Sequence, residues 1–214
     1  MNFWHVPPMW RGQTVAILAS GPSMTQADAN TVRDARLPTV AINTTWKLAP
    51  WADMLYAADS YWWERYKEEV KVFSGLRVSA CVGYRHPDLL FLRNTGKAGF
   101  DEDPSCVRTG GNSGYQALHV ALHTHARRVL LLGFDMCHPQ QQAHWHGRHP
   151  DPLRNAGEGV FDRWRKHFAD LAVAASRRGT EVINCTPGSA LKEWPQVPLE
   201  EALHPLHSER EMRV

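Results

Sequence analysis

The sequence has few cysteines, no long apolar run and almost no net charge. Its four cysteines are scattered and form no C-x-x-C pair, so a disulfide scaffold is not expected. The longest wholly apolar runs are a few residues long, too short to span a bilayer. A formal net charge of +2 at pH 7 gives no argument for a nucleic-acid or membrane partner. The opening residues Met1-Asn2-Phe3-Trp4 lack the features of a signal peptide, and we expect a cytoplasmic protein with reduced thiols.

Internal repeats, low-complexity tracts and the best-known catalytic motifs are also missing. The Gly21-Pro22 turn lacks the spacing of a dinucleotide fingerprint or a P-loop, and Ser23 does not lie in a G-x-S-x-G elbow. The 214 residues, 43% hydrophobic and 21% charged, have the composition of one ordinary globular domain. Nine tryptophans are many for this length. They indicate packing in the core and between subunits or, alternatively, a stacking surface for a base or sugar.

Short apolar runs alternate with helix-like segments along the chain, which is the pattern of a mostly parallel sheet. Strands are predicted at 14–19, 38–43, 54–58, 76–82, 129–132 and 181–185. Helices are predicted at 24–35, 61–72, after Asn112, at 161–178 and, more briefly, within 194–203. The sequence therefore predicts an α/β, Rossmann-like fold with helices on both faces of the sheet.

The same pattern predicts a single domain over residues 13–204. An N-terminal arm, residues 1–12, precedes it, and a frayed C-terminal tail, residues 205–214, follows it. Residues 83–107 show no clear period and are rich in Gly, Pro, Asp and Arg, which is typical of a long excursion that acts as a lid.

Small and polar residues follow several of the predicted strands. Ser20-Gly21-Pro22-Ser23 ends the first strand, and Asn43, Asp59 and Asp135 end later ones. Because the carboxyl ends of parallel strands meet at one edge of a sheet, these residues predict a ligand site there. Ser23 is a candidate N-cap, and the helix that it opens predicts either a phosphate contact or a plain turn. Asn and Asp at strand ends also commonly bond only to turn backbone.

The stretch from Arg108 to His149 carries the most information about function. Gly111 and Gly114 allow a ligand to approach the backbone closely, and Asn112 or Ser113 can cap the helix that follows. Arg108 beside this glycine loop suits a phosphate oxygen, although a solvated arginine is an equal interpretation.

Four histidines, His138, His144, His146 and His149, lie within twelve residues at the end of this stretch. They can hold a structural metal, supply a general base or a phosphate ligand, or lie incidentally on the surface. A histidine near its ordinary pKa removes a hydroxyl proton at neutral pH, as transfer to an acceptor alcohol requires. We therefore take His144, His149 and Arg108 as catalytic candidates and expect no metal.

Five short motifs resemble bacterial sialyltransferases of glycosyltransferase family 42. They also resemble the related 6-hydroxymethylpterin diphosphokinase-like and motility-accessory-factor proteins, which include phage and prophage members. The resemblance spans roughly Val15 to Leu191 but is dense only in the motifs. These are V-A-I-L-A-S-G-P-S-M (15–24), A-I-N (41–43), S-G-Y with L-G-F-D (113–115 and 132–135), H-W-H-G (144–147) and N-C-T-P-G-S-A-L (184–191).

The resemblance implies a site for a cytidine nucleotide. Gly21, Ser23, Asn43 and Ser113 would line it, Arg108 would lie near the phosphate, and His144 would be the base. The implied function is metal-independent glycosyl transfer from a CMP-activated sugar to a glycan or small-molecule acceptor.

Two other functions remain open from the sequence. In a diphosphokinase, Asp59 and Asp135 would hold Mg²⁺ between nucleotide phosphates. The other is a non-catalytic nucleotide-binding module. Under all of these functions, Ser20, Gly21, Gly111, Asn112 and Gly114 are candidate nucleotide contacts. The tryptophans and the sialyltransferase resemblance favour a homo-oligomer.

Overall fold

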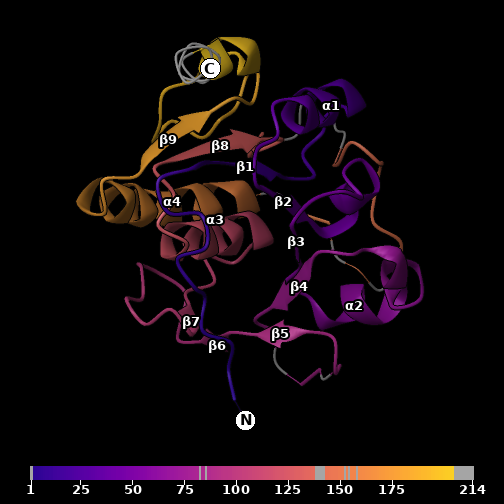
Figure 1. Cartoon of the computed structure of the whole chain (residues 1–214). Helices are drawn as coiled ribbons and strands as arrows, with labels where there is room; N and C mark the ends of the chain where they lie inside the picture. Colours follow the sequence, from indigo (N-terminus) through magenta and orange to yellow (C-terminus); the bar gives the residue numbers. More distant parts are fainter. Residues whose placement is uncertain are drawn as a thin grey trace.

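The computed structural model contains a seven-stranded parallel sheet with helices on both faces (Figure 1). It describes residues 2–81, 83–84, 86–137, 143–151, 153, 155–157 and 159–204. The strand order is β5-β4-β3-β2-β1-β8-β9, and all of these neighbours pair in parallel. The predicted α/β, Rossmann-like class is confirmed.

The elements follow one another closely along the chain. The main strands are β1 (Thr14–Leu18), β2 (Thr39–Ile42), β3 (Met54–Tyr56), β4 (Leu76–Ser79), β5 (Leu90–Phe91), β8 (Arg128–Leu132) and β9 (Glu181–Asn184). The α-helices are α1 (Gln26–Asp34), α2 (Ser60–Tyr66), α3 (Ser113–His123) and α4 (Val160–Arg177), with 3₁₀ turns η1 (Asn43–Lys47) and η2 (Glu69–Val72). Residues 199–204 form a last helical turn.

Strand β1 lies between β2 and β8, and all five of its residues are buried. Val15 and Ile17 point into the core that α3 and α4 cover, while Ala16 and Leu18 point into the core on the other face. This alternation is why a continuous apolar run makes a strand here, because both faces of the sheet are covered. Full burial of a Val, Ile or Leu side chain, as at Val15, Ile17 and Leu18, contributes about 1.5–3 kcal/mol to the free energy of unfolding.

Helix α1 begins at Gln26, and Thr25 is its N-cap. The side chain of Thr25 accepts a hydrogen bond from the backbone N–H of Asp28, and the Asp28 carboxylate accepts one from the backbone N–H of Thr25. The prediction that Ser23 caps this helix is wrong, because this capping box satisfies the helix start without it.

The helix predicted over Tyr61–Val72 is divided into α2 and the 3₁₀ turn η2. Trp62 and Trp63 of α2 are buried in the same core as Val70 and Phe73. Lys67 and Glu68 join the two elements in αR conformation, so the predicted helix is interrupted and not replaced.

The excursion at 83–107 carries short strands of its own. Strand β5 extends the main sheet, and β6 (Arg93–Asn94) pairs with β7 (Cys106–Val107) in a separate sheet. The N-terminal arm lies against this region, since the Trp4 N–H donates to the Phe91 carbonyl at 2.8 Å. Residues 205–214, the predicted tail, lie outside the described residues. Within the part of the chain that the structure describes, no helix has the length and apolar character needed to cross a membrane.

Candidate functional site

A cleft of about 1050 Å³ opens at the carboxyl edge of the sheet. The segments that follow β1, β2, β3 and β8 line it, together with the starts of α3 and α4. Part of the loop that carries His144, His146 and His149 (the histidine loop) also lines it. In residue numbers these are 19–22, 42–43, 58–62, 111–114, 133, 135–137, 143–144, 149, 160–161 and 163–164. This is the edge where ligands bind in open parallel sheets, because loop ends and helix N-termini converge there.

The turns after β1 and β8 are locked together. The Gly21 N–H donates to the Gly133 carbonyl at 3.0 Å. The backbone N–H and the hydroxyl of Ser23 donate to the two carboxylate oxygens of Asp135, at 3.2 and 2.8 Å. A Cβ on Gly21 would lie 1.9 Å from Asp135 Oδ2 and 2.4 Å from the Gly133 carbonyl oxygen, so only glycine fits this contact. Asp135 therefore holds the Gly-Pro-Ser turn in place.

The Asp135 carboxyl is buried, and this burial raises its pKa while the hydrogen bonds from Ser23 oppose the rise. Replacing Ser23 with alanine removes the shorter of these hydrogen bonds. We expect the free energy of unfolding to fall by about 1–3 kcal/mol, the usual cost of leaving a buried acceptor without its donor. Urea unfolding of the wild type and the variant at neutral pH measures this difference.

The matched control is Ser105→Ala, because the Ser105 hydroxyl donates to Asp103 in an exposed pair at 2.7 Å. The expected loss there is at most about 0.5 kcal/mol, as for most exposed positions. Equal losses in the two variants would show that Ser23 does not hold a buried carboxyl.

The ends of β2 and β3 are joined to the start of α3 by Ser113. Its hydroxyl accepts a hydrogen bond from the Ala58 N–H at 3.2 Å and donates one to Asn43 Oδ1 at 3.4 Å. Asn43 has a φ of 49°, in the left-handed region that asparagine tolerates better than most residues. Such backbone conformations cluster at ligand sites, and both Asn43 and Ser113 line the cleft.

The start of α3 presents open hydrogen-bond donors to the cleft. The Asn112 side chain caps this helix by accepting from the Tyr115 N–H at 2.8 Å, as predicted. The backbone N–H groups of Ser113 and Gly114 have no hydrogen-bond partner among the described residues. The first turn of α1 also has N–H groups without a partner among the described residues, those of Gln26 and Ala27, but this turn does not line the cleft. An anion in the cleft is therefore expected to bind at the start of α3 and not at the start of α1.

Several cleft residues were not predicted from the sequence as parts of the site. Lys97 and Arg163 add positive charge to the lining, and Phe161 and Trp164 add aromatic rings. Phe161 and Trp164 were predicted only as the apolar face of a helix; both lie in the first turns of α4, which reach the cleft. Lys97 lies in the excursion at 83–107, where no periodicity signals its position.

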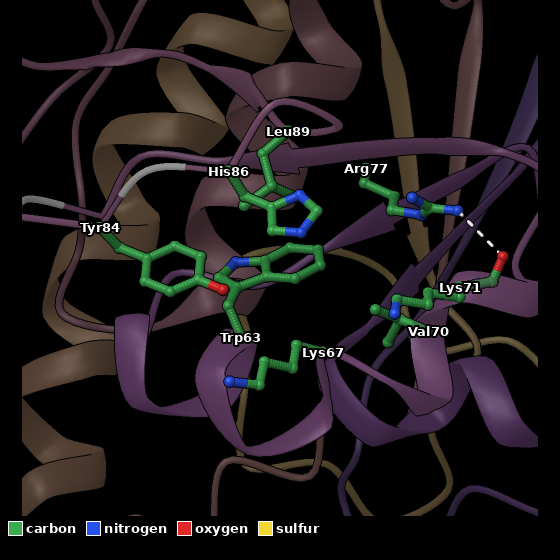
Figure 2. Close-up of a pocket in the computed structure, with 8 residues that line it drawn as sticks. All are labelled: Trp63, Lys67, Val70, Lys71, Arg77, Tyr84, His86 and Leu89. Atoms are coloured by element: carbon green, nitrogen blue, oxygen red, sulfur yellow. Dashed lines mark hydrogen bonds between the residues drawn. The ribbon is translucent and has the colours of Figure 1, made fainter.

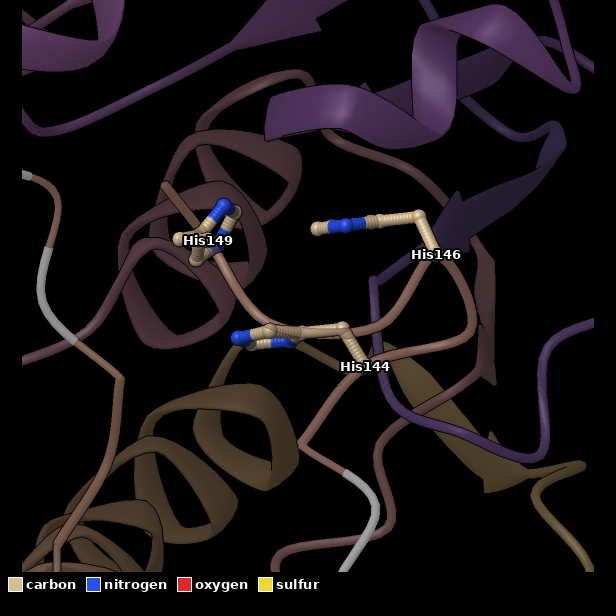
Figure 3. Close-up of side chains that lie close together, drawn as sticks. All are labelled: His144, His146 and His149. Atoms are coloured by element: carbon tan, nitrogen blue, oxygen red, sulfur yellow. The ribbon is translucent and has the colours of Figure 1, made fainter. Parts of the chain in front are cut away.

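The histidine loop forms one wall of the cleft. His144 Nδ1 lies 3.2 Å from the Ser20 carbonyl oxygen, and the Trp145 N–H donates to the same oxygen at 3.2 Å. The rings of His144, His146 and His149 point toward one another (Figure 3), and His144 and His149 line the cleft. Burial, followed by the adjacent histidine, lowers the pKa of His146 and of His149 from 6.5 to about 4.

The structure thus brings most of the predicted site together. Those residues that line the cleft are Ser20, Gly21, Asn43, Asp59, Gly111, Asn112, Ser113, Gly114, Asp135, His144 and His149. Ser23 lies just behind the lining, on Asp135. Arg108 is not among the lining residues, since its guanidinium Nε lies 3.5 Å from the Asp101 carboxylate. His138 lies outside the described residues.

A second cavity, beside α2, has a volume of only about 10 Å³ (Figure 2). The side chains around it are those of Trp63, Lys67, Val70, Lys71, Arg77, Tyr84, His86 and Leu89. This is no more than the space that a single water molecule needs. The large cleft is therefore the candidate site.

Comparisons with protein-family models, with curated proteins and with solved structures find no match to this chain.

Proposed function

We propose that this chain transfers a sugar from a CMP-activated donor to an acceptor hydroxyl in the cleft. The observation that carries the proposal is the meeting of four separate segments at one rim. These are the turn at Gly21, the strand end at Asn43, the helix start at Ser113 and the histidine wall at His144, all of which line the same cleft. The five motifs of the family 42 resemblance include these four positions, which supports a cytidine nucleotide as the ligand.

In this proposal the phosphate of the donor binds at the start of α3. The N–H groups of Ser113 and Gly114 donate to it, and Lys97 and Arg163 supply positive charge on the cleft lining. The rings of Phe161 and Trp164 give the pyrimidine a surface on which to stack.

His144 acts as the general base. Its Nδ1–H donates to the Ser20 carbonyl oxygen at 3.2 Å, which leaves the lone pair on Nε2. Nε2 takes the proton of the acceptor hydroxyl while the acceptor oxygen forms a bond to the anomeric carbon. The bond from that carbon to the phosphate oxygen breaks, and CMP leaves with the electron pair.

The geometry disfavours the diphosphokinase alternative. Both carboxylate oxygens of Asp135 accept hydrogen bonds from Ser23, and Asp59 caps α2 by accepting from the Tyr61 N–H at 2.8 Å. A Mg²⁺ ion held by this pair would have to share oxygens that already bind backbone and hydroxyl donors.

Thermal unfolding with a panel of nucleotides tests the proposed donor. CMP is expected to stabilise the chain by about 2.7 kcal/mol at a concentration near 100 times its Kd, and the effect should persist in EDTA. AMP and ATP should stabilise less. Stabilisation by ATP that requires Mg²⁺ would contradict the proposal and support a diphosphokinase. CMP binding without release of CMP from CMP-sugars would support a non-catalytic binding module.

A further inference from the structure

The imidazoles of His144, His146 and His149 converge on one point. One ligand atom from each residue lies within 4.8 Å of those from the other two. The ring centroids are 5.1 Å apart for His144 and His146, 4.3 Å for His144 and His149, and 4.8 Å for His146 and His149. Figure 3 shows the three side chains directed into the same small volume from one loop.

The loop that carries these histidines is anchored on both sides of the cluster. The Trp145 indole N–H donates to the Thr45 hydroxyl at 3.1 Å, beside His144 and His146. At the other end, the His149 N–H donates to Asn155 Oδ1 at 2.8 Å, and Asn155 Nδ2 donates to the His149 carbonyl oxygen at 3.2 Å. These hydrogen bonds fix the backbone on both sides of the cluster. The imidazole rings can therefore adjust mainly by small side-chain rotations.

Two ring nitrogens of the cluster are shielded from solvent and have no hydrogen-bond partner among the described residues. These atoms are His146 Nε2 and His149 Nδ1. A buried polar atom that makes no hydrogen bond costs about 1–3 kcal/mol, so a native fold rarely leaves two of them in one cluster. A ligand that accepts lone pairs from both nitrogens removes this cost.

We propose that His144, His146 and His149 form a three-histidine site for a divalent transition metal ion, with Zn²⁺ as the best fit. Zinc binds imidazole nitrogen at about 2.0–2.1 Å in a tetrahedral arrangement, so the ligand atoms must close by roughly an ångström. Three neutral imidazoles without a carboxylate suit Zn²⁺, Cu²⁺ or Ni²⁺ and not Mg²⁺, which prefers oxygen. This differs from the expectation, drawn from the sequence, that no metal is needed.

The second nitrogen of His144 supports this arrangement. Metal-bound histidines usually donate their other ring N–H to a carbonyl or carboxylate, and His144 Nδ1 faces the Ser20 carbonyl oxygen. His144 and His149 line the cleft, whereas His146 does not. Because two of the three ligands lie on the cleft lining, we expect the fourth ligand, water or an anion, to come from the cleft.

Metal binding and base catalysis compete for the same atom. The Nε2 atom of His144 cannot accept a proton while it coordinates an ion. Zinc is accordingly expected to inhibit the transfer reaction reversibly, and this consequence rests on the proposed function. The binding of zinc itself does not.

The test uses the full chain, Zn²⁺ alone and equilibrium dialysis against a chromophoric chelator. One Zn²⁺ per chain is expected to bind, and His146→Ala should weaken binding by at least about 10-fold. His5→Ala, at an exposed histidine far from the cluster in sequence, is the matched control and should bind like the wild type. His149→Gln should weaken binding like His146→Ala. The wild type loaded with Co²⁺ should show the visible bands of a four-coordinate ion.

Zinc binding that is unchanged in His146→Ala and His149→Gln, or equally weakened in His5→Ala, would overturn the proposal. A wild-type Co²⁺ spectrum typical of six-coordinate aqueous ion would do the same, even if the variants do not fold. The ratio of transfer rates with and without Zn²⁺ is measured separately in each protein. If no transfer occurs in any of them, the proposed function fails while the metal site still stands or falls on the dialysis.

Discussion

Replacing His144 with alanine is expected to slow the release of CMP from a CMP-activated sugar by about 10²–10⁴-fold, the range that a positioned general base contributes. His144 lines the cleft, and its Nδ1 contact with the Ser20 carbonyl oxygen, 3.2 Å long, orients the ring. Loss of the imidazole removes the proton acceptor and leaves the phosphate contacts at the start of α3. The rate constant at saturating donor and acceptor, measured in EDTA, is the quantity to compare.

His5→Ala controls for loss of a histidine elsewhere and should retain the wild-type rate, since His5 is exposed. Added imidazole should restore part of the activity of His144→Ala by supplying a base in solution. A variant that keeps more than about a third of the wild-type rate would show that His144 is not the base.

Replacing Gly21 with alanine is expected to abolish nucleotide binding and to destabilise the fold. The new Cβ would lie 1.9 Å from Asp135 Oδ2 and 2.4 Å from the Gly133 carbonyl oxygen. Because the second atom belongs to the backbone, a rotation of one side chain does not relieve the clash, and the turns after β1 and β8 must separate. Overpacking of this kind costs about 1–3 kcal/mol. Thermal unfolding with and without CMP measures both effects.

Gly157→Ala is the matched control, because a Cβ at Gly157 meets no atom within 4 Å. Its unfolding temperature and its stabilisation by CMP should equal those of the wild type. If Gly21→Ala binds CMP as well as Gly157→Ala does, the contact between the two turns has no part in the nucleotide site.

The sheet and its edge could be predicted because their signals are local. The run from Thr14 to Ala19 is apolar enough for a strand buried on both faces, and β1 is fully buried at the centre of the sheet. Asn43 and Asp135 end their strands in polar side chains, and parallel strands bring such ends to one edge. The strand pattern and the parallel direction of the strands are therefore enough to predict that both residues lie at the site.

Other parts of the site depend on contacts that the pattern does not encode. Arg108 stands beside the glycine loop in sequence, yet its guanidinium lies against Asp101. Ser23 was predicted to cap α1, but Thr25 with Asp28 forms the capping box and Ser23 binds Asp135, 112 residues away. Lys97 reaches the cleft from a segment held by short pairings such as that of β6 with β7. The places of these three side chains are set by tertiary packing and not by secondary-structure propensity.

A crystal structure of the chain in complex with CMP is the most direct test of the proposed nucleotide site. We expect CMP in the large cleft, with its phosphate within hydrogen-bond distance of the Ser113 and Gly114 N–H groups. The pyrimidine should lie between that helix start and the rings of Phe161 and Trp164. An empty cleft at saturating CMP, or CMP bound away from the carboxyl edge of the sheet, would contradict the proposed function.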